Sequence, residues 1–261
     1  MRYNILPCSV FLSNEKAENT RNTASHFLTV NHREKPLNLS ETPLASFEKE
    51  IDTLREVGNH FHARGWSLGT SSNYSVVTRR EPLELLITAS GKDKGCLSRG
   101  DFVRVAGDGL PIVGNQPRAS AETLLHIAIA EQANVGSVMH THSIWGTLLS
   151  DFYFYDRGFR IEGYEMLKGL AGVTTHKHAE WVPVFDNTQD IPVLAEQVRQ
   201  CLKDSESPIQ HGFLIRRHGL YTWGCDLDEA KRHIEIFEFL FECVARRLTF
   251  DGVMLNSPNN S

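Results

Sequence analysis

The order of predicted helices and strands in this chain of 261 residues predicts an α/β fold with a mixed, largely antiparallel sheet covered by helices. The elements follow in the order αβββαβαβαββα, which lacks the regular strand–helix alternation of a parallel sheet. Short runs rich in β-branched and aromatic residues identify the strands, and apolar residues spaced three and four apart identify the helices.

The sequence predicts five helices. The first begins near Thr42-Pro43, an N-cap followed by proline at the first helical position, and Gly65 ends it. The last helix runs from Asp226 to about Leu248, with an apolar residue on nearly every turn of one face. The other three helices are predicted at 121–132, where Ser120 is the cap, at about 145–149, and at 191–203.

Seven short strands are predicted between these helices. Glycine-rich turns separate the first three strands, and a buried strand over Ser137–His142 ends in two histidines. The predicted ranges are 74–78, 85–88, 102–105, 137–142, 181–185, 212–217 and 220–223. Polar composition without sustained periodicity predicts a poorly ordered N-terminal extension over 1–40. The folded domain then covers 41–250, followed by a flexible tail at 251–261.

Composition limits the class of function. The net charge of -5 and the absence of a basic run argue against nucleic acid as a partner. No stretch approaches 18 uninterrupted apolar residues, so no membrane span is expected. Five scattered cysteines without CxxC spacing are typical of a reducing cytoplasm. We therefore expect a cytoplasmic enzyme.

Histidines at alternate positions indicate a metal site. His140 and His142 would share one face of the predicted strand, because alternate side chains of a strand point the same way. His218, at the end of another apolar strand, could supply a third imidazole. Three histidines with an open fourth position are typical of catalytic zinc. The same HxH spacing occurs at 60/62, which we interpret as structural or solvated. It also occurs at 176/178, the main competitor for the metal, for which we favour a loop or outer-shell role.

Six segments of the chain, in order, resemble the class II aldolase/adducin family over about residues 44–248. The segments are 69–75 (GTSSNYS), 88–92 (TASGK), 120–123 (SAET), 140–143 (HTHS), 165–169 (EMLKG) and 217–224 (RHGLYTWG). The resemblance implies a three-layer α/β domain and one zinc ion per subunit on His140, His142 and His218. It also implies a homotetramer with active sites near subunit interfaces.

The resemblance also gives the glycine- and serine-rich loops a role in phosphate binding. Backbone N–H groups of tight turns and hydroxyl groups can hold an anion, and Lys92 would add charge. Without the resemblance, each loop would be read as an ordinary turn. The predicted substrate-binding residues are Gly69, Ser71, Ser72, Asn73, Ser90, Gly91 and Lys92.

Two glutamates are candidates for catalysis. Glu165 occupies a segment that carries the acid/base in dehydratases of this family, and we favour it over Glu122. Glu122 matches the catalytic glutamate of related aldolases, but some dehydratases have cysteine there, so its role stays open. Either could instead be a surface carboxylate, Glu122 in the first turn of a helix and Glu165 paired with Lys168.

The segments around Glu165 and Trp223 favour one activity within the family, the dehydration of 5-methylthioribulose 1-phosphate in methionine salvage. An aldolase or epimerase acting on fuculose or ribulose phosphates is the alternative within enzymes. An adducin-like scaffold without catalysis is the alternative outside them. Loss of the metal histidines is expected of such a scaffold, whereas all three are present here.

Overall fold

A single eight-stranded sheet runs through the part of the chain that the structure, a computed structural model, describes, namely residues 44–204 and 209–255. The strand order is β3-β2-β1-β4-β8-β7-β6-β5. Neighbouring strands pair antiparallel except β6 and β7, which are parallel. The strands are β1 Asn73–Arg79, β2 Glu84–Thr88, β3 Phe102–Ala106, β4 Ser137–Thr141, β5 Gly158–Glu162, β6 Ala179–Phe185, β7 Gly212–Ile215 and β8 Gly219–Gly224.

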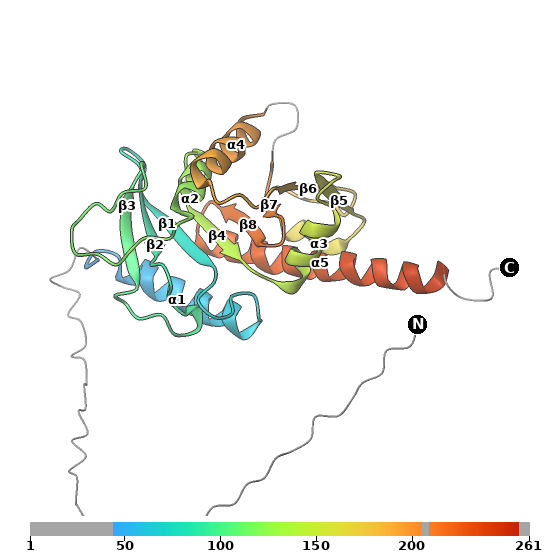
Figure 1. The fold of residues 1–261 in the computed structure, drawn as a ribbon, viewed down its shortest axis with the longest axis horizontal. Coiled ribbons are helices and arrows are strands. Elements are labelled where there is room, and N and C mark those ends of the chain that lie inside the picture. Colours follow the sequence, from blue (N-terminus) through green and yellow to red (C-terminus); the bar gives the residue numbers. More distant parts are fainter. Residues whose placement is uncertain (1–43, 205–208, 256–261) are drawn as a thin grey trace, which may run out of the picture. The chain divides into compact units, whose positions relative to one another are not determined.

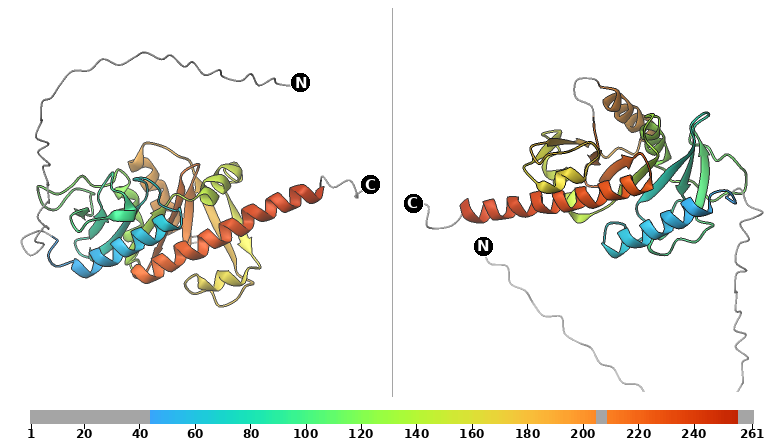
Figure 2. Two further views of the ribbon diagram at one scale, coloured as in Figure 1. Left: turned by 90° about the horizontal axis from the view of Figure 1, so that it is seen from below. Right: turned by 180° about the vertical axis from the view of Figure 1, so that it is seen from behind.

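Helices cover both faces of this sheet, which confirms the predicted three-layer α/β fold (Figure 1). One face carries α1 (Glu48–Ala63), α3 (Ile144–Phe152) and α5 (Leu227–Leu255), and Figure 2 shows α1 and α5 lying side by side. The other face carries α2 (Thr123–Ala130) and α4 (Ile191–Lys203). Two 3₁₀ turns, η2 (Lys94–Cys96) and η3 (Glu165–Gly169), lie between these elements.

Two hydrophobic cores lie on the two faces, and neighbouring residues of one strand feed both. In β2, Leu86 packs into the core under α1 and α5, whereas Leu85 and Ile87 pack under α2 and α4. In β4, Met139 and Val138 divide in the same way. Strands β2 and β4 are buried at every position, so their apolar residues contribute to both cores.

The structure differs from the predicted elements mainly at their ends. Sequence analysis missed β5, an edge strand in which Phe159 and Ile161 are buried and Arg160 is exposed. The strand predicted over 212–217 ends at Ile215, because Arg217 has a left-handed backbone (φ 51°) and turns the chain into β8.

Helix ends differ as well. The helix predicted from 121 begins at Thr123. The last helix continues to Leu255, into the predicted tail, while the extension at 1–40 and residues 256–261 lie outside the described residues. Among the described residues, none of the helices combines the length with the apolar composition that a membrane span requires.

Candidate active site

Three histidines converge where β4 meets the turn between β7 and β8. His140 lies in β4, His142 follows its last residue, and His218 precedes Gly219 of β8. Antiparallel pairing of β4 with β8 sets His140 opposite Tyr221, so the two segments meet although they are far apart in sequence. One ring nitrogen of each histidine lies within 4.8 Å of the others.

Hydrogen bonding fixes the orientation of His140. Its Nδ1 is 2.9 Å from the carbonyl oxygen of Leu220, so Nδ1–H donates and the Nε2 lone pair faces the centre of the group. The ring also stacks on Tyr221, with centroids 4.0 Å apart. A backbone carbonyl that holds the second ring nitrogen is the usual arrangement of a metal-ligating histidine.

Burial favours the neutral, metal-ligating form of His140 and His142. Burial, followed by the charges of His142 and His218, holds the pKa of His140 well below its usual range, and burial lowers the pKa of His142 to about 4. The two Nε2 atoms lie 2.7 Å apart, which requires a shared proton or metal ion, because two lone pairs repel. The buried Nδ1 of His218 has no hydrogen-bond partner among the described residues. This donor set fits a borderline divalent ion such as zinc.

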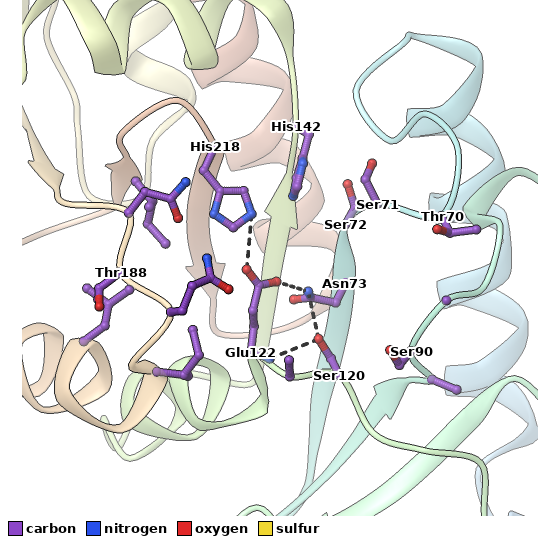
Figure 3. A pocket seen from close by; sticks show the side chains of 18 residues that line it. Thr70, Ser71, Ser72, Asn73, Ser90, Ser120, Glu122, His142, Thr188 and His218 are labelled. Atoms are coloured by element: carbon purple, nitrogen blue, oxygen red, sulfur yellow. Dashed lines mark hydrogen bonds and ion pairs between the residues drawn. The ribbon is translucent and has the colours of Figure 1, made fainter.

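Glu122 is the carboxylate that the chain brings to this centre (Figure 3). It immediately precedes α2, and its Oε1 lies 3.2 Å from Nε2 of His218. Its Oε2 lies 3.7 Å from Nε2 of His140 and accepts a 2.6 Å hydrogen bond from the Asn73 side-chain amide. The charge therefore lies directly beside the three imidazoles.

A buried hydrogen-bond chain orients the Asn73 amide. Nε2–H of His126 donates to Oδ1 of Asn73, and Nδ1 of His126 accepts from the Ser75 hydroxyl at 2.7 Å. With its oxygen engaged, the amide directs its NH₂ group to Glu122 and to Ser120. Sequence analysis missed His126, whose one signal is its place as the basic residue in the otherwise apolar α2.

A cavity of about 280 Å³ opens beside Glu122 and the histidines. Most of the predicted phosphate-binding residues line it, and so do Thr70 and Ser120. The lining also includes a loop at 187–189, which sequence analysis missed. Figure 3 shows Ser71, Ser72 and Thr70 on the opposite side of the cavity from His218. The predicted residues in the lining are Ser71, Ser72, Asn73, Ser90 and Gly91.

Two predicted phosphate-binding residues are not part of this lining. Lys92 forms an ion pair with Asp101 at 2.7 Å, and Gly69 lies one residue before the lining at Thr70.

Ser72 adopts a left-handed backbone (φ 70°), as does Arg217 next to His218. Strained non-glycine residues of this kind persist only where the surrounding structure holds them.

The far side of β4 contacts a buried acid of α5. Thr141 points away from the histidines and donates to Glu238 at 3.1 Å. Burial raises the pKa of Glu238 to about 7, and its hydrogen bonds with Ser143 and Thr141 oppose that increase. The alternation of side chains along β4 thus separates the histidines from a polar contact with α5.

Glu165, the favoured catalytic residue, does not lie at this centre within one chain. It begins η3, its side chain is 71% exposed, and it pairs with Lys168 and, at 3.7 Å, with His176. These contacts lower the pKa of its carboxyl, with the Lys168 hydrogen bond as the largest cause.

The competing HxH pairs engage other partners. His60 pairs with Glu235 of α5 at 2.9 Å, and His62 lies 3.5 Å from Asp93. His178 pairs with the buried Glu180 at 2.6 Å, in a second group that also includes His211.

This chain belongs to the class II aldolase and adducin N-terminal domain family, whose model matches residues 52–245. The family is typically metal-dependent. The fold of this chain is similar to that of a solved L-fuculose-1-phosphate aldolase from Thermus thermophilus. The two are 24% identical with a TM-score of 0.61, and the match covers 78% of this chain and 98% of that one. A sugar-phosphate aldolase from Thermotoga maritima is also similar (17% identity, TM-score 0.55, 77% and 97%).

Curated relatives are considerably closer in sequence. The methylthioribulose-1-phosphate dehydratase of Marinobacter nauticus is 49% identical over 192 residues, which is 73% of this chain and 90% of that protein. The protein of the same name from Pseudomonas aeruginosa is 45% identical over 205 residues, 77% of this chain and 96% of that protein.

Burial of His126 predicts that the protein loses stability in acid. Its pKa is lowered from 6.5 to about 3, so between these values the unfolded chain binds a proton that the folded chain does not. The contribution of His126 is therefore complete above pH 6.5 and decreases as the pH falls. At pH 5 the loss is about 2 kcal/mol. His126→Gln keeps an amide donor for Asn73 but cannot titrate. Urea unfolding at pH 7 and pH 5 should show a smaller pH effect in this variant. Equal pH effects in both proteins would contradict the prediction.

Proposed function

We propose that this protein catalyses the zinc-dependent dehydration of 5-methylthioribulose 1-phosphate to 2,3-diketo-5-methylthiopentyl 1-phosphate, a step of methionine salvage. The convergence of three imidazoles and Glu122 beside a serine- and glycine-lined cavity carries this proposal. The names of the close relatives support the substrate and the reaction. The scattered cysteines favour a cytoplasmic location.

The substrate phosphate would be bound by the loops at 70–73 and 90–91. These loops offer serine hydroxyls and the backbone of tight turns, which suit an anion without a dedicated lysine. Lys92 is already paired with Asp101, so it would contribute only a screened charge. Phosphate at this end of the cavity directs the ketone of the substrate toward the histidines.

His140, His142 and His218 would hold the metal ion. The ion would act as a Lewis acid on substrate oxygens and stabilise the negative charge that develops near them. Glu122 lies beside the same nitrogens, with its carboxylate oriented by Asn73. This carboxylate can contact the substrate or accept a proton from it.

Dehydration removes the proton on C3 and expels the hydroxyl group on C4, so it requires a proton acceptor and a proton donor. We assign acid/base catalysis to Glu165 of a neighbouring subunit. Its carboxylate is exposed and lies outside the cavity of its own chain, which suits a group presented to another chain. Its segment matches the acid/base segment of dehydratases in this family.

A homotetramer would bring such subunits together. On α3, directly after His142, Ile144, Leu148 and Phe152 recur every fourth residue and are 69%, 56% and 63% exposed. A stripe of this kind beside the candidate site supports subunit packing there.

Two alternative functions are compatible with this fold. The solved sugar-phosphate aldolases support the fold of this chain. The close relatives favour the dehydratase over an aldolase or epimerase. An adducin-like scaffold is disfavoured, because the three histidines are present and converge.

Direct turnover separates these functions. Purified protein should dehydrate 5-methylthioribulose 1-phosphate, and removal of the metal by chelation followed by addition of zinc should abolish and restore that activity. Fuculose 1-phosphate and ribulose 5-phosphate serve as competing substrates in coupled assays. If either sugar is cleaved or epimerised faster than 5-methylthioribulose 1-phosphate is dehydrated, the protein is an aldolase or epimerase instead.

Replacement of His218 tests the metal ligands. His218→Ala removes one of three donors, so zinc affinity should fall by more than the roughly 10- to 100-fold that loss of an outer-shell contact costs. Zinc content by mass spectrometry is the measurement, and His178→Ala is the matched control that should retain zinc. Full zinc in His218→Ala, with zinc lost from His178→Ala, would transfer the ion to the second histidine group.

Replacement of Glu165 tests the acid/base assignment. Glu165→Gln keeps the size of the side chain but cannot exchange a proton, so kcat should fall by about 100- to 10,000-fold. Zinc content should not change, because Glu165 is not near the histidines of its own chain. Near-normal dehydration by this variant would reject the assignment and direct attention to Glu122→Gln.

A further inference from the structure

A second buried group of ionisable side chains lies on the opposite part of the sheet from β1–β3. His178 precedes β6, Glu180 lies in β6, His211 precedes β7, and His233 lies in α5. Glu180 is 1% exposed, and its Oε1 has no hydrogen-bond partner among the described residues. The dehydration assigned to the first site does not use this group, which we name the buried histidine cluster.

The geometry of the cluster is that of shared protons rather than of a bound metal. A single carboxylate oxygen, Oε2 of Glu180, lies 2.6 Å from Nε2 of His178 and 3.0 Å from Nδ1 of His211. The ring centroids of these histidines are 6.2 Å apart, against 4.5 to 4.9 Å among the three histidines of the candidate active site. The carboxylate oxygen thus lies between the two rings and accepts from both.

The cluster holds the backbone of Ala171 from both sides. Nε2–H of His211 donates to the carbonyl oxygen of Ala171 at 2.8 Å, and the N–H of Ala171 donates to Nε2 of His233 at 3.0 Å. The other nitrogen of His233 donates to the Trp223 carbonyl at 2.6 Å, which leaves Nε2 free to accept. The backbone of one residue is thereby connected to β6, β8, α5 and the residue before β7.

Charge and burial support these proton positions. Both nitrogens of His211 face acceptor oxygens, which suits an imidazolium beside a buried carboxylate. Burial lowers the pKa of His211, but the Glu180 and Ala171 contacts outweigh it and raise the pKa overall. Burial lowers the pKa of His233 to about 4, so this ring stays a neutral acceptor.

Ala171 follows directly on the segment that carries Glu165. Leu167 and Leu170 of this segment are buried, and Arg232 of α5 donates to the Gly169 carbonyl at 2.9 Å. The N–H of Gly163 donates to the His176 carbonyl at 3.2 Å, which closes the segment into a loop. The exposed carboxylate of Glu165 is therefore carried by a segment whose buried side is held by these contacts.

We propose that the buried histidine cluster positions Glu165 for proton transfer by clamping the backbone of Ala171. His211, Glu180 and His233 are then positioning residues, and His178 supplies the second hydrogen bond to Glu180. This inference rests on the function proposed for Glu165. A loosened clamp would let the carboxylate leave its productive position, and misplacement by about 1 Å can cost a hundredfold in rate.

Hydrogen exchange and kinetics of the full-length protein with zinc bound test the clamp. His211→Ala removes the contacts to Glu180 and Ala171. Amides of 165–173 should exchange on the order of tenfold faster. The kcat should fall by about 10- to 100-fold, with KM and zinc content unchanged. His211→Gln, which can still donate to the Ala171 carbonyl, should recover much of the rate. His60→Ala breaks a half-exposed histidine–glutamate pair between α1 and α5 and should leave exchange in 165–173 and kcat unchanged.

A double substitution separates positioning from general stability. In the Glu165→Gln background, adding His211→Ala should lower kcat by less than about twofold, because the group being positioned is already absent. If His211→Ala does not fold, Glu180→Gln keeps the volume while removing the charge, and should give the same pattern with a smaller loss. Unchanged exchange at 165–173, additive losses in the double variant, or a second zinc ion per chain that is lost in His211→Ala would each overturn the proposal. If the proposed role of Glu165 is itself wrong, Glu165→Gln alone will turn over normally. That result distinguishes this failure from the outcomes above.

Discussion

Pairing of β4 with β8 is the constraint on which the candidate active site depends. The register that sets His140 opposite Tyr221 and Thr141 opposite Leu220 brings the end of one strand to the start of the other. A slip by one residue would turn His140 toward α5 and Thr141 toward the cavity, because strand side chains alternate. The apolar residues on both faces of β4 fix this register, so the two cores of the fold also determine how the three histidines converge.

The polar groups around this centre form connected chains rather than isolated contacts. Ser75, His126 and Asn73 transmit orientation to Glu122 from β1 and α2. Toward the other end of the sheet, a second chain holds the backbone of Ala171 through hydrogen bonds of His178, Glu180 and His211. In both chains a buried imidazole has each nitrogen engaged by a hydrogen-bond partner, which fixes the orientation of its ring. The sheet therefore carries two buried networks, one that contacts Glu122 and one that contacts the backbone of the segment that includes Glu165.

Local pattern predicted a mixed sheet covered by helices and proposed the three histidines, and the family resemblance selected them over the competing pair at 176/178, but neither predicted the surroundings of the site. Alternation placed His140 and His142 on one face, and a second apolar strand pointed to His218. The contact of Asn73 with Glu122 spans 49 residues, and that with His126 spans 53, so no local spacing reveals either. Edge strand β5 was missed because only Phe159 and Ile161 of its five residues are apolar and buried. Glu165 was favoured from its segment alone, and within the chain its side chain is exposed and lies outside the cavity lining.

Gly219 has a practical meaning for the comparison of related sequences. A β-carbon at this position would collide with the carbonyl oxygen of Thr141 and press on the His140 ring. Every missense change of a glycine codon adds at least that carbon. A homologue that retains all three histidines but has another residue here would have to open the β4–β8 ladder to accommodate it. The glycine is therefore as informative as the ligands themselves when genomes are searched for working copies of this enzyme.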